Sequence, residues 1–365
     1  MGESGDMAPG GAPVIVVPEP RIRELPLEFR GSGAEYFRIW IVNLLLSMVT
    51  LGIYSAWAKV RRLRYFHGST WLDGSAFGYH ASPVSILKGR LIAAALFLAY
   101  ASGERVSPLL SVAAALVFLT LLPWIVVRSR AFQLANTSYR NLRFGFDRCY
   151  RKMVGLYYGG GLLVAVTLGI ALPWWMARRY TILVGNSRFG ASRFEAGFHT
   201  GQFYRMYTKI SLVALLAVTV VVLVMVAIVA TGAGSSAAEP DPVVVMRMVV
   251  AAYVVVLPAM LFVSAWAQTM VMNAVYNGTC IGHVQLRSAL RVWPLYRLYL
   301  GNLVAIVLTL GMFVPWARVR LARYRASTLT VLAHGSLDNF FAGQGDAGSA
   351  LGGEIGDFFD VDLGF

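Results

Sequence analysis

Charged residues are scarce in this chain, and their scarcity excludes an ordinary soluble protein. Only 14% of the 365 residues are Asp, Glu, Lys or Arg, whereas 57% are hydrophobic. Soluble domains carry roughly 25% charged residues. A chain of this length cannot hide so much apolar surface in one core, so the remaining apolar surface is expected to face lipid.

Cysteine and histidine are also rare, and their positions argue against two further classes of protein. The two cysteines, Cys149 and Cys280, are too few for a disulfide framework. The five histidines show neither His-x₃-His nor Glu-x₂-His spacing, which a helical metal site would use. We therefore expect no metal and no other cofactor.

Motifs for catalysis and for ion coupling are missing as well. No Gly-x-Ser-x-Gly or P-loop pattern occurs, and the long apolar segments contain no ionisable residue. Proton and cation couplers usually keep an ionisable residue at mid-membrane. These absences disfavour proton-coupled transport and predict that the protein is not an enzyme.

Long apolar segments are what the sequence has in abundance. Seven can be distinguished: 39–58, 91–102, 108–127, 154–176, 210–231, 248–268 and 298–317. A spanning helix needs about 20 apolar residues. The second and third segments are joined by a short turn, and the fifth and sixth by a small, acidic stretch. Each of these pairs predicts a transmembrane hairpin.

The other three segments share a Thr-Leu-Gly sequence followed by a tryptophan. Basic residues flank all three on both sides, and Lys and Arg mark the cytosolic side. If each segment enters the bilayer and returns, all basic residues except Arg105 and Arg247 lie inside. The glycine supplies the backbone freedom for such a turn. Re-entrant elements are therefore favoured, and plain spanning helices in an unusual orientation are the alternative.

Five tryptophans follow or end the membrane elements and predict anchors at the membrane interface. They are Trp57, Trp124, Trp174, Trp266 and Trp316. Four of them are followed four residues later by an arginine: Arg61, Arg128, Arg178 and Arg320. These arginines predict a cytosolic collar that collects an anionic solute or a lipid headgroup; the alternative is that they fix the topology and contact lipid phosphate.

Short polar stretches follow the basic segments and predict β-hairpins. In the first, Asp73-Gly74 is a turn dipeptide flanked by apolar residues. Corresponding apolar positions after the tryptophans are Phe77, Phe144, Phe194 and Leu286. One isolated hairpin is marginally stable, so five of them are expected to gather into a small cytosolic β layer.

These features predict an all-α polytopic membrane protein with short cytosolic β-hairpins. The expected plan is a tandem repeat of a re-entrant (or short) membrane element plus a transmembrane hairpin, with both termini cytoplasmic. The predicted parts are a disordered extension (1–27), two membrane repeats (28–156 and 157–297), a final membrane element with its hairpin (298–340), and an acidic tail (341–365).

Several stretches resemble the YjgN-like family of bacterial inner-membrane proteins. They include Phe29-Arg30-Gly31, Trp57-Ala58-Lys59-Val60-Arg61, Leu72-Asp73-Gly74 and Pro315-Trp316-Ala317-Arg318-Val319-Arg320. The resemblance extends from about residue 27 over nearly the whole chain. It implies location in the inner (plasma) membrane and no particular reaction. Members of that family are often encoded beside a membrane-associated zinc metallopeptidase, so the resemblance implies such a peptidase as a partner.

Polar residues within the apolar segments are the candidates for an intramembrane path. Asn43 and Asn302 precede their tryptophans by equal distances, and so do Thr50, Thr167 and Thr309. Polar groups in lipid need hydrogen-bond partners. These side chains therefore either join helices to one another or line a path between them.

The functional hypothesis is binding or passage of an anionic or amphipathic small molecule or lipid, without proton coupling. The alternative is a non-transporting membrane scaffold that organises lipid or holds a partner such as a membrane protease. Anionic lipid headgroups are expected partners. Nucleic acid is not, because the basic residues behind the net charge of +14 flank apolar segments. The oligomeric state is left open.

Overall fold

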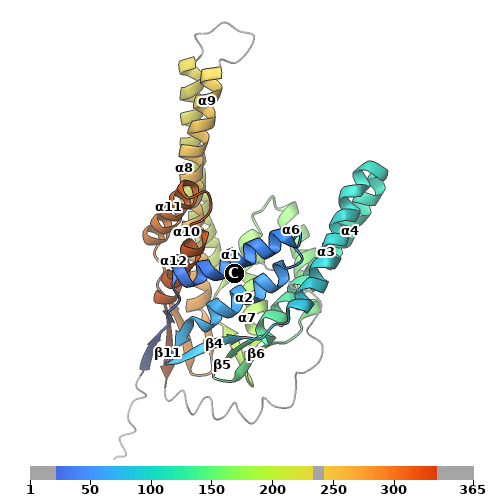
Figure 1. Ribbon diagram of the computed structural model, residues 1–365, viewed down its shortest axis with the longest axis vertical. Coiled ribbons are helices and arrows are strands. Elements are labelled where there is room, and N and C mark those ends of the chain that lie inside the picture. The colour runs from blue at the N-terminus through green and yellow to red at the C-terminus, as the bar shows by residue number, and fades with distance from the viewer. Residues whose placement is uncertain (1–21, 233–241, 335–365) are drawn as a thin grey trace, which may run out of the picture.

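The computed structural model describes residues 22–232 and 242–334 (Figure 1). The strands gather at one end of the molecule, and the longest helices project away from them (Figure 1). The predicted acidic tail lies outside the described residues, as do residues 1–21 of the predicted disordered extension. The rest of that extension is ordered, because Ile22–Pro26 form a strand.

The strands form one 11-stranded antiparallel sheet in the order β1-β11-β10-β9-β8-β7-β6-β5-β4-β3-β2. Their bounds are β1 Ile22–Pro26, β2 Glu28–Phe29, β3 Thr70–Leu72, β4 Ser75–Tyr79, β5 Thr137–Tyr139, β6 Leu142–Phe146, β7 Ser187–Phe189, β8 Ser192–Ala196, β9 Thr279–Ile281, β10 Val284–Ser288 and β11 Leu329–His334.

The sheet is nearly closed into a barrel because its two outermost strands are consecutive in the chain. β1 pairs with β11, with Ile22 opposite His334, and β2 pairs with β3, with Glu28 opposite Trp71. Between them, the Leu27 N–H donates to the Leu329 carbonyl at 3.0 Å. One continuous segment therefore bridges the two ends of the sheet. Closure removes the free strand edges that would otherwise invite pairing with other chains.

The predicted all-α fold with short hairpins is wrong. Each hairpin pairs with the next one, through β4 with β5, β6 with β7, β8 with β9, and β10 with β11. The signals for the hairpins, such as the turn dipeptide Asp73-Gly74, are local and do not indicate pairing between hairpins. Separate hairpins would leave backbone N–H and C=O groups unpaired, whereas a continuous sheet satisfies them. The fold combines long helices with a barrel-like sheet.

Apolar side chains from nearly every strand fill the interior of the barrel. Alternation along a strand sends every second side chain inward. The buried core consists of Leu25, Leu72, Tyr139, Phe189, Ile281, Val284, Val331 and Ala333. The apolar positions singled out in the sequence, Phe77, Phe144, Phe194 and Leu286, pack against this core.

Four helical stretches among the described residues are long and apolar enough to cross a membrane: Pro83–Ala101, Leu109–Ala135, Thr200–Ala227 and Tyr253–Asn277. The first three lie in α3 (Pro83–Val106), α4 (Pro108–Ala135) and α8 (Thr200–Gly232). The fourth lies in the short π-helix η2 (Ala252–Val256) and in α10 (Leu257–Asn277), and α9 (Pro242–Ala251) precedes η2. They coincide with the two predicted transmembrane hairpins.

The three Thr-Leu-Gly segments each fold as two helices that reverse at that sequence. The pairs are α1 (Gly33–Val49) with α2 (Ser55–Gly68), α5-η1-α6 (Tyr150–Gly155, Leu156–Gly160, Gly161–Val166) with α7 (Leu172–Gly185), and α11 (Val292–Leu308) with α12 (Val314–Ser327). The three leucines have φ of 49°, 50° and 50°, and the glycines have φ of 90°, 91° and 91°. Whether these turns enter the bilayer stays a prediction.

The barrel has two chemically different ends. Helices α2, α4, α7, α10 and α12 run directly into β3, β5, β7, β9 and β11 at one rim, which we call the proximal end. The four hairpin turns lie at the opposite rim, the distal end, where β1 also begins and β11 finishes. The helices that carry the apolar segments are therefore all attached at the proximal end.

Candidate functional site

A cavity of about 280 Å³, the proximal cavity, lies between α4, α7 and α10 where these helices meet the barrel. Its lining residues are Val126, Ser129, Arg130, Gln133, Leu134, Phe144, Arg179, Tyr180, Leu183, Val184, Ser187, Phe194, Met272, Val275, Tyr276, Thr279 and Leu286. Nine of these 17 side chains are apolar, and the other eight carry polar groups; small-molecule sites combine apolar walls with convergent polar groups in this way.

Helical and strand periodicity explain why these residues meet. On each helix the lining residues recur every three or four positions, as Arg130 and Gln133 do on α4, so they share one face. Phe144, Phe194 and Leu286 lie in the second strands of their hairpins and form the barrel side of the cavity. The rings of Phe144 and Phe194 stack with centroids 6.5 Å apart.

Two guanidinium groups give the proximal cavity its charge. The Nε of Arg130 is buried and has no hydrogen-bond partner among the described residues. Arg179, on the facing helix α7, lies with its guanidinium 5.8 Å from the centroid of the Trp175 ring. None of the described lining residues is acidic. A cation taken out of water without a carboxylate nearby is costly, so an anion in this cavity would be stabilised.

Tyrosine hydroxyls supply the neutral polar groups of the cavity. Burial raises the pKa of Tyr180, and the nearby Arg179 only partly opposes that rise, so the phenol is protonated at neutral pH. Protonated phenols donate hydrogen bonds. The hydroxyls of Ser187 and Thr279 instead donate to the Leu183 and Val275 carbonyls, at 2.8 and 2.6 Å. The Ser187 and Thr279 hydroxyl hydrogens are therefore already used within the protein.

The arrangement suits a molecule with an anionic head and an apolar body. Guanidinium groups bind carboxylates and phosphates through two parallel hydrogen bonds. Apart from Ser129 and Gln133, the remaining surface of the cavity is contributed by valine, leucine, methionine and phenylalanine side chains. A small polar anion would leave most of that apolar surface uncovered.

The three threonines of the predicted path lie at the helix reversals. In each turn the hydroxyl donates to the carbonyl four residues earlier, at 2.7 Å, and accepts an N–H from four residues later. The bonds of Thr50, Thr167 and Thr309 therefore tie the end of one helix to the start of the next. None of the three is among the described lining residues of the proximal cavity.

Asn43 in α1 and Asn302 in α11 are both buried. Asn302 donates from Nδ2 to the Ala317 carbonyl at 3.3 Å. The Oδ1 of each asparagine has no hydrogen-bond partner among the described residues. Neither residue lines the proximal cavity as described, so the path that these five residues were expected to form stays a prediction.

The structure places the four predicted collar arginines away from the proximal cavity. Arg61, Arg178 and Arg320 are exposed, whereas the Nε of Arg128 is buried without a hydrogen-bond partner among the described residues. The cavity arginines are close neighbours of two of them in the sequence, Arg130 beside Arg128 and Arg179 beside Arg178. Each residue along a helix turns the direction of the side chain by about 100°. Sorting arginines by helix face, rather than by distance from tryptophan, would have found them.

The five predicted anchors are all half-buried and pack at helix junctions. Trp316 lies 5.0 Å from the Phe37 ring and so close to Gly33 that a Cβ there would collide with it. Trp57 stacks on Tyr54 at 6.2 Å. These contacts give the tryptophans a packing role within the protein; their position at the headgroup level stays a prediction.

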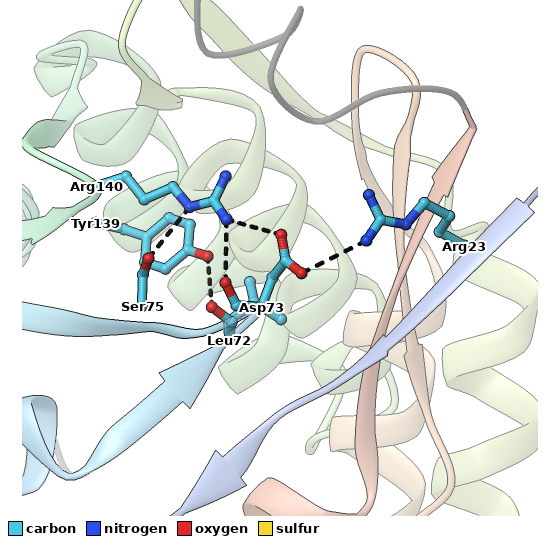
Figure 2. Close-up of polar contacts among 6 residues, drawn as sticks. All are labelled: Arg23, Leu72, Asp73, Ser75, Tyr139 and Arg140. Carbon is cyan, nitrogen blue, oxygen red and sulfur yellow. Dashed lines mark hydrogen bonds and ion pairs between the residues drawn. The ribbon is translucent and has the colours of Figure 1, made fainter.

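Charged residues at the distal end form hydrogen bonds and ion pairs with one another (Figure 2). Arg140 Nη2 donates to Asp73 Oδ2 at 2.7 Å and to the Asp73 carbonyl at 3.0 Å, and Arg23 Nη2 lies 3.7 Å from Asp73 Oδ1. The Tyr139 hydroxyl donates to the Leu72 carbonyl at 2.7 Å. The cluster joins the turns of two hairpins to the strand that closes the barrel.

Comparison with known proteins places the chain among bacterial membrane proteins. A family described as "bacterial protein of unknown function (DUF898)" matches residues 24–358. Inner membrane protein YjgN of Salmonella typhimurium is 24% identical over 355 residues, covering 86% of this chain and 89% of that protein. Inner membrane protein YjgN of Escherichia coli K12 is 30% identical over 147 residues, covering 39% and 36%. No solved structure matches the chain.

Proposed function

Since the chain belongs to the DUF898 family, whose YjgN relatives are named inner membrane proteins, we propose that it binds an anionic amphipathic molecule at the inner membrane. The binding site is the proximal cavity, and Arg130 and Arg179 hold the anionic head. Binding involves no proton coupling.

The observation that carries this proposal is the environment of Arg130. Its Nε is buried without a hydrogen bond, and the described cavity residues include no carboxylate. Removing the partner from a buried ion pair typically costs about 3–5 kcal/mol. An anionic ligand would supply the missing counter-charge and two acceptor oxygens.

The apolar part of the ligand has a natural route. α4 and α10, which form two sides of the cavity, contain two of the four candidate membrane spans. A hydrocarbon tail can therefore lie along Val126, Leu134, Met272 and Val275 and continue between these helices toward lipid. The head would remain at the barrel, and the tail would follow the membrane-spanning helices.

The chemistry of the cavity favours binding without proton transfer. Guanidinium groups stay protonated at every physiological pH. The described lining residues include no carboxylate, histidine or lysine that could exchange a proton with the ligand. Occupancy is therefore expected to change little between pH 6 and 8.

Binding is favoured over passage by the threonines at the helix reversals. Their hydroxyl hydrogens are already donated within their own turns, which leaves the expected path without those donors. The rival hypothesis is a scaffold that organises lipid or holds a partner such as a membrane peptidase. It differs in predicting that Arg130 and Arg179 are dispensable for ligand binding.

The test is binding of lysophosphatidylglycerol to the purified full-length chain, measured by native mass spectrometry. Arg130→Met and Arg179→Met should each weaken binding by about tenfold, equivalent to about 1.4 kcal/mol. Arg178→Met is the matched control, because it removes the neighbouring charge on the exposed side of α7. A monoacylglycerol, which lacks the anionic head, should bind weakly to every variant.

Equal binding by the wild type and the two cavity variants would contradict the proposal. So would a loss caused by Arg178→Met as large as the loss caused by Arg179→Met. The thermal unfolding midpoint of each variant, measured without ligand, separates lost binding from lost folding.

A further inference from the structure

A second hollow, the α11–α12 groove, has a volume of about 540 Å³ and lies between α11 and α12. Its lining residues are Arg297, Leu298, Gly301, Arg320, Arg323, Tyr324 and Ser327. Three of these seven residues are arginines, and none of those described is acidic. Three positive charges that line one groove repel one another, so an anion bound there would relieve that repulsion.

Each arginine of the groove is held by a single contact that leaves further donors unused. Arg297 lies 5.0 Å from the Trp293 ring centroid, and Arg320 lies 5.5 Å from the Phe313 ring centroid. Arg323 donates from Nη2 to the Gly31 carbonyl at 3.0 Å. Within the described part of the chain, none of the three forms an ion pair with a carboxylate. A guanidinium has five N–H donors, so most of them remain available for an anion.

The width of the groove is fixed by Tyr324. Its hydroxyl donates to the Arg291 carbonyl and accepts the Arg291 N–H, both at 3.0 Å. This pair of bonds ties α12 to the residue that precedes α11. The space beside Gly301 is open, since a Cβ there would meet nothing within 4 Å.

The same construction occurs in the first helix pair. The Tyr65 hydroxyl donates to the Ser32 carbonyl and accepts the Ser32 N–H, both at 2.9 Å, which ties α2 to the residue that precedes α1. Unlike Tyr324, it also lies 3.2 Å from a carboxylate oxygen, Glu35 Oε2. Three arginines then stand at the same spacings as those of the α11–α12 groove: Arg38, Arg61 and Arg64. All three are exposed.

Both arginine triads lie on helix pairs whose far ends are apolar. The reversal leucines, Leu51 and Leu310, are each 94% exposed, and Val49 and Leu308 beside them are 80% and 78% exposed. Such ends favour contact with hydrocarbon over water. Arginines nearer the barrel on the same helices would then lie at the depth of lipid phosphates.

We propose that the α11–α12 groove and its counterpart on α1–α2 each bind the phosphate ester of an anionic phospholipid headgroup. The guanidinium groups bind the phosphate oxygens, and the acyl chains run along the apolar helix ends. These two sites are separate from the proximal cavity and do not depend on it.

The experiment compares three arginine-to-glutamine triples in nanodiscs that contain phosphatidylglycerol and phosphatidylcholine. R297Q/R320Q/R323Q removes one triad, and R38Q/R61Q/R64Q removes the other. R143Q/R193Q/R287Q is the matched control, because it removes the same charge from exposed positions on the sheet. Native mass spectrometry after release from the nanodisc counts the phosphatidylglycerol molecules that stay bound.

Each triad variant should retain one phosphatidylglycerol fewer than the wild type, and the control should retain as many as the wild type. An equal loss in the control would overturn the proposal, because it would show a response to net charge alone. Unchanged retention in both triad variants would overturn it as well. R320K tests whether the planar guanidinium is needed, because lysine keeps the charge but cannot form two parallel hydrogen bonds to a phosphate. This substitution should weaken phosphatidylglycerol retention severalfold.

Competition with inorganic phosphate tests whether the triads bind a lipid headgroup or a free phosphate anion. At 10 mM it should displace little phosphatidylglycerol, because it lacks acyl chains. Full displacement by inorganic phosphate would reassign the triads to a free anion and overturn the lipid proposal. The unfolding midpoint of each triple, measured in the same nanodiscs, shows that the variants are folded.

Discussion

The arginine side chains at the two ends of the barrel differ in whether they are paired with a carboxylate. At the distal end, Arg140 forms a 2.7 Å ion pair with Asp73, which also lies near Arg23. At the proximal end, the Nε of Arg130 is buried and forms no hydrogen bond with any described residue, in a cavity whose described lining has no carboxylate. The arginine at the distal end is thus paired with a carboxylate of the protein. For the arginine at the proximal end we propose an anionic ligand in that role.

Backbone geometry supports the same distinction. Arg140 has a φ of 46°, a left-handed conformation that costs a side-chain-bearing residue about 1 kcal/mol or more. The hydrogen bonds from Arg140 to Asp73 offset that conformational cost. Arg130 lies in the regular helix α4. Its Nε has no hydrogen-bond partner in the part of the chain that the structure describes, and this is the difference that the proposed ligand site at the proximal end rests on.

The largest effect should come from a titratable group near the proximal end, His67. It stacks on Tyr79 with ring centroids 5.2 Å apart, and burial lowers its pKa to about 4. Between about pH 6.5 and 4 the unfolded chain binds a proton that the folded protein does not. Stability should therefore fall as the pH drops through that window, by up to about 3 kcal/mol.

Denaturant unfolding of wild type and His67→Phe at pH 7 and at pH 4.5 measures this loss. The variant should lose much less stability on acidification than the wild type. Exposed His199, replaced in the same way, is the control and should leave the wild-type loss unchanged. If the free energy of unfolding fell equally with pH in the wild type and in His67→Phe, His67 would not be the cause of the loss.

The second effect tests the distal end. Asp73→Asn keeps the left-handed turn, which asparagine tolerates, but removes the charge that Arg140 and Arg23 face. We expect the free energy of unfolding to fall by about 2 kcal/mol. Glu28→Gln, at an exposed pair with Arg30, should cost less than about 0.5 kcal/mol. Similar losses from the two substitutions would mean that the distal cluster is no more than a surface ion pair.

The smallest effect should have the opposite sign. Arg130→Met removes a buried cation that has no carboxylate beside it, so the protein without ligand should become more stable by about 1 kcal/mol. Lysophosphatidylglycerol should stabilise the wild type and not this variant, as unfolding midpoints with and without ligand would show. Destabilisation by Arg130→Met would contradict this expectation, because it would show that Arg130, like Arg140, stabilises the protein without a ligand.

Much of the helical architecture could be predicted from the sequence. Length and hydropathy located the two long hairpins, and Asp73-Gly74 marked the turn between β3 and β4. The reversals at Thr-Leu-Gly followed from the conformational freedom of Gly52, Gly169 and Gly311. Each of these signals is local, in the sense that the residues that carry it also form the structure.

The closed sheet could not be predicted in this way. Ile22–Pro26 contains two charged residues and ends in proline, so nothing within it indicates a strand. It is a strand only because β11 lies beside it. The candidate site was missed for a related reason. Arg179 differs from Arg178 only in the direction that its side chain takes from α7, which depends on how that helix packs against its neighbours.

Closure of the barrel by its first strand has a consequence for synthesis. β1 is made before all the candidate membrane spans, and its partner β11 is made after them. Until β11 leaves the ribosome, β1 has no strand to pair with and the sheet has two open edges. Pairing between distant segments is slow, and unpaired edges favour aggregation. The barrel therefore closes only on chains whose candidate membrane helices have all been made.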